Sequence, residues 1–238
     1  MDFIQQSTVV VAKELLGKKL LVNHDGVLVG GYIVETEAYV GVDDMACHCY
    51  NGKRTPKVES MYLKGGTIYV YTMHTHQMVN IVTKNKDEPE AVLIRAIEPV
   101  DNIDMMIHNR KVAGINVSNG PGKLTKAMRI TKEFNGVLIN ESQLILDETN
   151  CMKPYNIIVS PRIGIPNKGK WTNELLRFYV EGNPYVSKIP KKSMKNAIDT
   201  WIWKIENEIQ GLLNSFSIFK LIKFLFLLVF SYQISEEI

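Results

Sequence analysis

The sequence has too few cysteines for a disulfide framework. Its 238 residues include only Cys47, Cys49 and Cys151, and an odd number of cysteines cannot all pair within one chain. No cleavable signal segment is recognisable in the opening residues, MDFIQQSTVV. We therefore expect a protein of a reducing compartment.

The same cysteines make a poor metal site. Cys47, His48 and Cys49 are consecutive and lie close to Asp43 and Asp44, which raises the question of bound zinc. Structural zinc sites use two pairs of ligands, each pair spaced by about two to four residues. Consecutive side chains diverge and no second pair is present, so the spacing predicts that no metal is bound.

A strong net charge is also absent. The 28 basic and 25 acidic residues leave a charge of +3 and a pI near 8.6. Any contact with nucleic acid must therefore come from a local basic face rather than from a global field. Lysines and arginines gather around residues 53–57, 123–132 and 188–195, although such runs are also typical of solvated faces.

No segment rich in glycine, serine or proline divides the chain before about residue 188. The length suits one sizeable domain, so we expect a domain over residues 1–188 and a tail over residues 189–238. Apolar residues spaced three and four apart from Ile198 onward predict an amphipathic helix that starts near Ser193.

The end of the tail is an apolar run over residues 218–232 that contains Lys220 and Lys223. A membrane span takes roughly 20 apolar residues, and this run is shorter and charged. Packing on the domain or on a partner is therefore favoured, and an interfacial membrane helix is the alternative.

The order of predicted elements favours an α+β fold with a curved, largely antiparallel sheet and surrounding helices. An Asp-Gly turn at residues 25–26 predicts a hairpin. The chain is expected to be helical over residues 8–16, 99–110 and 122–130, and extended over residues 19–22, 27–38, 67–71, 79–83, 91–97, 137–147, 155–165 and 176–180.

The most informative stretch is IVETEAYVG, residues 33–41. In a strand, successive side chains point to opposite faces, so Glu35, Glu37 and Tyr39 are predicted to share one face. Glutamate is depleted in strands, and a buried charge rarely stays unpaired. A strand rich in aromatic residues (67–71) and a strand that contains Arg95 (91–97) follow within about sixty residues. Together these residues favour a polar site over a solvent-facing strand surface.

Seven segments carry a resemblance when they are taken in order. The chain resembles the alkyladenine (3-methyladenine) DNA glycosylase family over roughly residues 5–187. The segments are ETEAY at 35–39, RTP at 54–56, GTIYVY at 66–71, LIRAIEP at 93–99, NGPGKLTKAM at 119–128, PRIGI at 161–165 and LRFYVEGNPYVS at 176–187.

The resemblance implies the catalytic residues. Glu37 matches the family's catalytic glutamate, which activates water and offsets the charge of an oxocarbenium-like sugar. Arg95 matches the arginine that holds the water and the carboxylate. The backbone carbonyl of Ile163 is implied as a further water ligand, while Glu35 is interpreted as structural and paired with a nearby cation.

The resemblance also implies a pocket for a base flipped out of duplex DNA. Tyr39, His48 and Tyr71 would enclose the damaged purine, whose positive charge favours aromatic partners. The backbone amide of His48 would read the base edge, and Asn80 would exclude a guanine amino group. Each aromatic residue alone is more often a core residue, but their combination favours a pocket.

The chain departs from the family where a wedge tyrosine and a glycine are usual, since it has His74 and Thr75 there. We expect His74 to fill the gap left by the flipped nucleotide, with His76 as an alternative. A non-glycine residue tolerates positive φ poorly, so the backbone of this loop is in question. The phosphate contacts are expected at Lys53, Arg54 and Thr55.

The leading hypothesis is a monofunctional DNA glycosylase of base excision repair that needs no cofactor, acts as a monomer on damaged double-stranded DNA and leaves an abasic site. It would act in the cytoplasm or nucleoid, or in the nucleus of a eukaryote. The alternatives are a catalytically weak DNA-damage binding protein and a protein whose tail contacts a partner or a membrane surface.

Overall fold

Eight strands form one sheet in the order β3-β4-β5-β2-β1-β6, with β9 beside β2 and β8 beside β9. Neighbouring strands in this sheet run antiparallel. The strands are β1 (Lys19–His24), β2 (Val27–Tyr39), β3 (Ile68–Met73), β4 (His76–Thr83), β5 (Glu90–Asp101), β6 (Leu144–Asp147), β8 (Ile157–Ser160) and β9 (Arg177–Val180). Two short strands, β7 (Lys153–Pro154) and β10 (Trp201–Ile202), form a separate pair.

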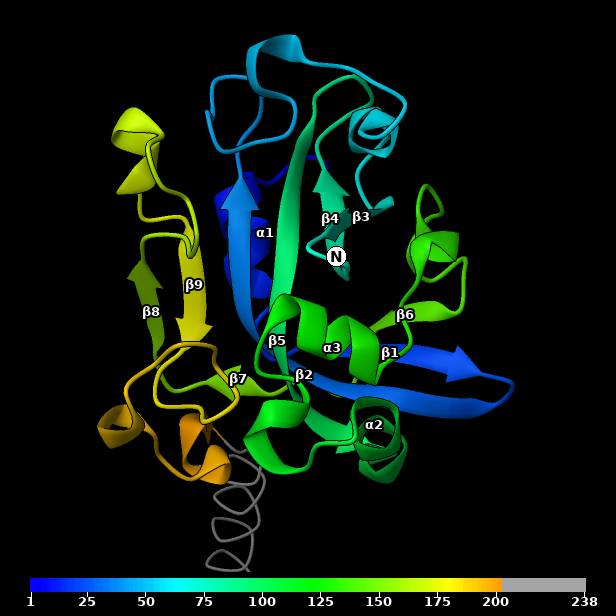
Figure 1. Ribbon diagram of the computed structural model, residues 1–238, viewed down its shortest axis with the longest axis vertical. Coiled ribbons are helices and arrows are strands. Elements are labelled where there is room, and N and C mark those ends of the chain that lie inside the picture. Colours follow the sequence, from blue (N-terminus) through cyan, green and yellow to red (C-terminus); the bar gives the residue numbers. More distant parts are fainter. Residues whose placement is uncertain (203–238) are drawn as a thin grey trace, which may run out of the picture. The chain divides into compact units, whose positions relative to one another are not determined.

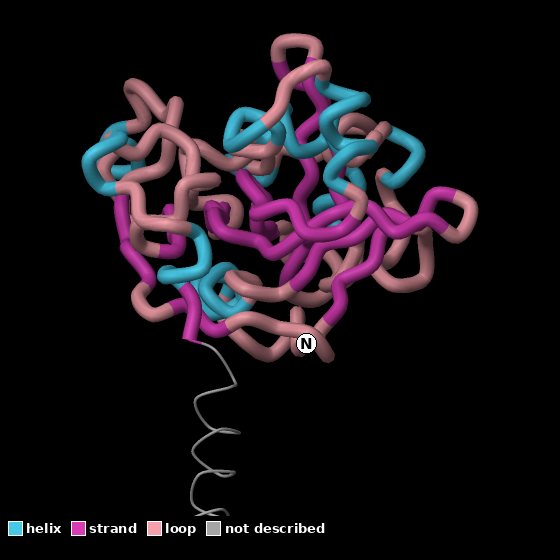
Figure 2. The backbone as a smooth tube through the Cα atoms, turned by 90° about the horizontal axis from the view of Figure 1, so that it is seen from below, coloured by secondary structure: helices cyan, strands magenta, loops and turns pink. Residues whose placement is uncertain are grey.

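Helices cover both faces of the sheet. The described residues contain α1 (Thr8–Glu14), α2 (Ile103–Arg110) and α3 (Pro121–Ala127), with short 3-10 turns between them. In Figure 1, α1 lies behind β2 and β5, while α3 crosses in front. Figure 2 shows helices on both sides of the strands. This architecture confirms the predicted α+β class with an antiparallel sheet.

The structure, a computed structural model, describes residues 1–202. Met1–Trp201 form one compact unit. The apolar run over residues 218–232 and the expected helical tail beyond residue 202 lie outside the described residues.

The long strand β2 is bent where its neighbour changes. One edge of β2 pairs with β5 along most of its length, whereas the other edge pairs first with β1 and then with β9. Register shifts between Gly30 and Gly31 and on both sides of Glu35 mark this transition. Such bulges bend a strand and re-aim its side chains, which gives the sheet its curvature.

The predicted alternation along β2 is confirmed by contacts. The Thr36 hydroxyl donates to the carbonyl oxygen of Ala12 in α1 at 2.8 Å, so Thr36 faces the helix behind the sheet. Glu35 and Glu37 both contact Arg95, and Glu37 contacts the Tyr39 hydroxyl. These side chains therefore share the opposite face.

The expectation of a helix from Ser193 is wrong for the described part of that segment. Two 3-10 turns (Lys191–Ser193 and Ala197–Thr200) lead instead into β10. The Trp201 indole donates to Glu98 at 2.9 Å, and Asn183 donates to the Thr200 hydroxyl at 3.0 Å. These side-chain hydrogen bonds hold Thr200 and Trp201 in a backbone conformation that differs from a continuous helix.

Several other elements are shorter than predicted. The helix expected from residue 99 begins at Ile103, because residues 99–101 continue β5 beside β2, across the register shift between Gly30 and Gly31. The strand expected over residues 155–165 is confined to β8, Ile157–Ser160. The strand expected over residues 137–147 is confined to β6, Leu144–Asp147.

Candidate active site

Glu37 is fully enclosed in the middle of the sheet. Its Oε1 accepts a hydrogen bond from the backbone N–H of Ile163 at 2.7 Å. Its Oε2 accepts from the Tyr39 hydroxyl at 3.0 Å and lies 3.2 Å from Nη1 of Arg95. Two hydrogen-bond donors and one cation, from three separate segments, therefore converge on one carboxylate.

The charge balance around this carboxylate is uneven. Burial raises the pKa of Glu37, an effect opposed by Arg95, the Ile163 N–H and the Tyr39 hydroxyl and reinforced by Glu35. Burial acts against the charge of Arg95, but Glu37 and Glu35 together raise the pKa of Arg95 above its usual value. The result is a charged arginine beside a carboxylate that binds a proton more readily than usual.

Glu35 has a different environment from its neighbour two residues later. Its Oε1 accepts from Nε of Arg95 at 2.9 Å, from Nε of Arg177 at 2.7 Å and from the Ser187 hydroxyl at 2.9 Å. Its Oε2 accepts from the backbone N–H of Ser187 at 2.8 Å. Glu35 is thus saturated by donors and ties β2 to β5, β9 and the segment after β9.

A small inner cavity of about 20 Å³ lies beyond Tyr39. This volume is about the room needed for one water molecule. Its lining residues are Tyr39, Ala46, Cys47, His48, Met61, Tyr69, Tyr71, Asn80 and Ala91. The structure therefore brings together four of the predicted pocket residues, Tyr39, His48, Tyr71 and Asn80.

The rings of His48, Tyr69 and Tyr71 line the inner cavity and contact one another. The His48 ring stands edge-on to Tyr71, with centroids 4.5 Å apart and planes at 74°. Its Nδ1 is 2.8 Å from the Tyr69 hydroxyl. Burial and the nearby Lys53 lower the pKa of His48, so the ring is neutral at pH 7. Burial and the charge of Glu37 raise the pKa of Tyr71 to about 12.

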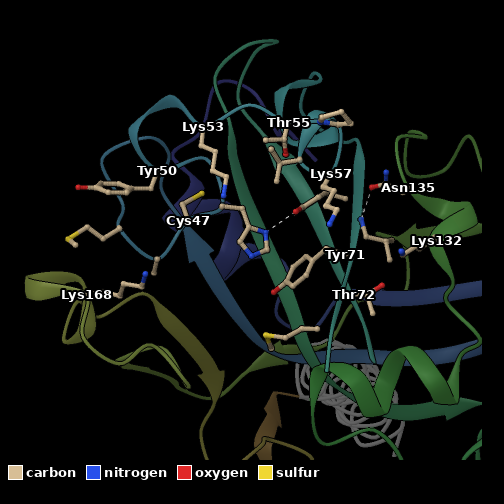
Figure 3. A pocket seen from close by; sticks show the side chains of 18 residues that line it. Cys47, Tyr50, Lys53, Thr55, Lys57, Tyr71, Thr72, Lys132, Asn135 and Lys168 are labelled. Carbon is tan, nitrogen blue, oxygen red and sulfur yellow. Dashed lines mark hydrogen bonds between the residues drawn. The ribbon is translucent and has the colours of Figure 1, made fainter. Parts of the chain in front are cut away.

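A larger outer pocket, of about 860 Å³, opens in front of these rings. It shares Ala46, Cys47, His48, Tyr69 and Tyr71 with the inner cavity. Four lysines and no carboxylate line it, and Figure 3 shows them on different sides of the Tyr71 ring: Lys53, Lys57, Lys132 and Lys168. The outer pocket therefore offers positive charge to whatever enters it.

The predicted phosphate contacts divide into two kinds. Lys53 and Thr55 line the outer pocket. Arg54 instead forms ion pairs with Glu59 at 2.5 Å and with Asp87 at 2.6 Å, so its charge is already compensated. The contact seen at Ile163 is through its amide, and the role expected for its carbonyl stays a prediction.

The predicted wedge residues lie at the tip of the β3–β4 hairpin. His74 and Thr75 form its two-residue turn with φ of 46° and 69°, and both side chains are exposed. His76, which opens β4, packs against α3, where a Cβ added at Gly122 would stand 2.7 Å from its Cβ. The non-glycine loop thus adopts the positive φ values that the sequence put in question.

Sequence reasoning did not single out several residues of this region. Tyr69 could have been found, because it is two residues before Tyr71 and so shares its strand face. No local pattern marks Lys168. Arg162 lies in the matched segment PRIGI, but nothing in the sequence pairs it with Asp44, which is 118 positions away. Within residues 1–202, no group of three or more His, Cys, Asp and Glu side chains is placed to bind a metal ion.

Comparison with known proteins agrees with this geometry. The profile of the methylpurine-DNA glycosylase family matches residues 2–184. The chain belongs to the methylpurine-DNA glycosylase family. Two relatives, from Staphylococcus saprophyticus and Staphylococcus haemolyticus, are 52% and 51% identical to it over 201 residues. Both are provisionally named 3-methyladenine DNA glycosylase, and the alignments cover 84% of this chain and 99% and 100% of theirs.

Membership of this family implies that the substrate is DNA. The positive charge of the lysines in the outer pocket agrees with such a substrate. Among the residues that the structure describes, no helix has the length and apolar character needed to cross a bilayer.

Proposed function

We propose that this protein is a monofunctional DNA glycosylase that hydrolyses the N-glycosidic bond of alkylated or deaminated purines flipped out of duplex DNA. The observation that carries this proposal is the buried Glu37, held by Arg95 and by the hydroxyl of Tyr39, whose ring lines the inner cavity. The provisional name of the relatives supports 3-methyladenine as a substrate.

Glu37 is proposed as the general base. Cleavage of the bond between a purine and its sugar passes through an oxocarbenium-like state, which needs an activated water and a nearby negative charge. A carboxylate whose pKa is raised by burial is a stronger base than an exposed one. Arg95 would hold both the carboxylate and the water in place, with the Ile163 carbonyl as a further water ligand.

The damaged base is proposed to enter from the outer pocket and to stack among Tyr39, His48 and Tyr71. Because the inner cavity is small and the His48 ring stands edge-on to Tyr71, entry requires the His48 ring to turn away from the Tyr69 hydroxyl. A neutral His48 does not repel the positive charge of an alkylated purine. Asn80, whose amide already donates to the Tyr69 carbonyl at 3.0 Å, would face the purine's minor-groove edge.

The lysines of the outer pocket are proposed to hold the DNA backbone, with His74 as the wedge at the tip of the hairpin. Lysine contacts with phosphates are independent of sequence and sensitive to salt. No lysine lines the inner cavity, and a lyase reaction would need an amine nucleophile there. Water as the nucleophile makes the protein monofunctional.

The test is the chemistry of release from a duplex that carries one labelled 3-methyladenine or hypoxanthine. Wild-type protein is expected to release the free base and to leave a strand that breaks only after alkali, with no covalent adduct trapped by borohydride. Strand breakage without alkali, together with a trapped adduct, would overturn the monofunctional assignment. Damage-specific binding without release of a base would favour a DNA-damage binding protein instead.

A further inference from the structure

A single buried arginine lies next to both hydrogen-bond donors to Glu37. Arg162 is adjacent in sequence to Ile163, whose N–H donates to Oε1 of Glu37. Its guanidinium carbon lies 4.7 Å from the ring centroid of Tyr39, whose hydroxyl donates to Oε2. The charges of Arg162 and Glu37 also attract each other through space, so a variant that tests positioning must leave the charges of this region unchanged.

Arg162 is anchored by a carboxylate that is equally buried. Nη1 and Nη2 donate to the two oxygens of Asp44 at 2.5 and 2.9 Å, and neither side chain is exposed. Nη1 also donates to the carbonyl oxygen of Ala38 at 3.0 Å, between Glu37 and Tyr39 in the sequence. A two-point pair of this kind fixes orientation as well as distance.

Asp44 is in turn fixed by the backbone on both sides of the turn after β2. Its Oδ1 accepts from the N–H of Ala46 at 2.9 Å, and its Oδ2 accepts from the N–H of Val40 at 3.3 Å. The pair therefore joins the end of β2, the approach to His48 and the loop after β8. A buried, unmatched charge would be costly, yet this pair satisfies both charges locally.

We propose that the Arg162–Asp44 pair is a positioning device that presents the Ile163 N–H and the Tyr39 hydroxyl to Glu37. The inference rests on the proposed function, because it assumes that Glu37 is the general base. Arg162 and Asp44 are positioning residues and do not contact the substrate.

The proposal has a consequence that a purely structural role would not share. The Ile163 N–H and the Tyr39 hydroxyl both oppose the effect of burial on Glu37. If the pair is loosened, those two bonds weaken and the pKa of Glu37 rises further. The charged or titratable groups that face Glu37 from the surrounding segments, and that stay in place, are Arg95, Glu35, Tyr71 and Arg177.

The variants are Arg162→Lys and Asp44→Glu. Glutamate keeps the charge of Asp44 but is longer by one methylene, which displaces the two oxygens that Arg162 contacts. Lysine keeps the charge of Arg162 but loses the two-point bond. The loss of Nε removes no hydrogen bond, because this buried atom has no partner within residues 1–202. Arg110→Lys is the matched control, since Nε of Arg110 is also buried without a partner in the described part of the chain and Arg110 lines neither pocket.

The measurement is single-turnover excision of hypoxanthine from duplex DNA between about pH 5 and 9, with the affinity for the damaged duplex measured in parallel. We expect the acidic limb of the rate profile to move to higher pH in both variants, with affinity unchanged. If the acidic limb moves up by one pH unit, the rate at pH values below the limb falls about tenfold. At alkaline pH, where Glu37 is ionised in every variant, the rate returns to that of the wild type. The control should keep the wild-type limb.

A rate that falls equally at every pH in Arg162→Lys and Asp44→Glu, with the limb unmoved, would overturn the inference. If Arg162→Lys does not fold, Asp44→Glu gives the same test from the other side of the pair. Failure of the proposed function looks different, because wild-type protein would then release no base, or Glu37→Gln would release it at the wild-type rate.

Discussion

At the scale of single residues, the candidate site is built around a fully buried carboxylate. Glu37 has no exposed surface and three hydrogen-bonding or charged partners. Glu35, equally buried, is saturated by two arginines and Ser187. Two glutamates of one strand thus have different surroundings: Glu35 joins strands, and Glu37 is the one that we propose as the general base.

The raised pKa of Glu37 predicts the shape of the pH profile of the wild-type protein. The base must be ionised to act, so the rate should rise with pH through the pKa of Glu37. Because burial raises that pKa above its ordinary value of 4.5, the acidic limb should lie above pH 4.5. Single-turnover excision of hypoxanthine, a neutral base, reports this limb directly. A limb below pH 4.5 would contradict the assignment of Glu37 as the base.

The lowered pKa of His48 predicts how binding depends on pH. Burial and Lys53 hold that pKa below its ordinary value of 6.5, so the ring is neutral above pH 6.5 and gains a charge only in more acidic solution. Affinity for a duplex with cationic 7-methylguanine should therefore be flat from about pH 7 to 8 and should fall only in solution more acidic than pH 6.5. Fluorescence anisotropy measures this, and His48→Gln should remove the fall. Weakening that begins above pH 7 would contradict the account.

The residues that could be predicted were those in one contiguous pattern or in one matched motif. Glu37 and Tyr39 are two positions apart on one strand, so they share its face. In the structure, Glu37 contacts both Arg95 and the Tyr39 hydroxyl. Arg162 also lies in a matched motif, but its pairing with Asp44 could not be predicted, because 118 positions separate the two residues. Only the pairing of β2 with β9, and of β9 with β8, brings the second residue back to the first.

At the scale of elements, the β3–β4 hairpin carries the clearest conflict between sequence and backbone. Both turn residues have positive φ, as the preferred two-residue hairpin turn requires. Thr75 is β-branched and tolerates this region poorly. The contact between His76 and Gly122, and the bond from the Thr125 hydroxyl to the Gln77 carbonyl at 2.8 Å, hold the hairpin on α3 in spite of that cost.

Thr75→Asn should therefore stabilise the protein. Asparagine adopts positive φ more readily than a β-branched residue, and the left-handed region costs most residues roughly 1–2 kcal/mol. We expect the free energy of unfolding to rise by about 1 kcal/mol, measured by urea denaturation. Thr72→Asn, in the extended part of β3, serves as the control and should give no gain. A Thr75→Asn protein less stable than wild type would show that the turn is not strained.

The elements that could be predicted were those with strong local signals. The Asp-Gly turn set the β1–β2 hairpin, and Ser7 caps α1 by accepting from the N–H of Val10. The segment after Ser193 was predicted as a helix because its apolar spacing fits one. Long-range bonds of Trp201 and Thr200 to Glu98 and Asn183 override that local preference, and no single-sequence pattern reports them.

At the scale of the whole molecule, a small net charge is combined with a concentrated basic pocket. The chain has a charge of only +3, yet four lysines and no acid line the outer pocket. The affinity for DNA should therefore come from this face. It should decrease only modestly with salt, because only the lysines of this face would contribute.

The double variant Lys53→Ala/Lys132→Ala tests this view. Each lost phosphate contact should weaken binding to damaged and undamaged duplexes alike and should reduce the slope of log affinity against log salt by about 0.9. Lys153→Ala, exposed on β7 and absent from both pockets, is the control. Anisotropy titrations at several salt concentrations give the slopes. A slope unchanged in the double variant would place the DNA on another face.

The most direct test of the whole account is the comparison of Glu37→Gln with wild type in single-turnover excision, with binding to the same damaged duplex measured alongside. Glu141→Gln, an exposed glutamate that lines neither pocket, is the matched control. The account predicts that Glu37→Gln binds the duplex as tightly as wild type but excises the base at least about a hundredfold more slowly, as loss of a general base does. Excision by Glu37→Gln at the wild-type rate would contradict it.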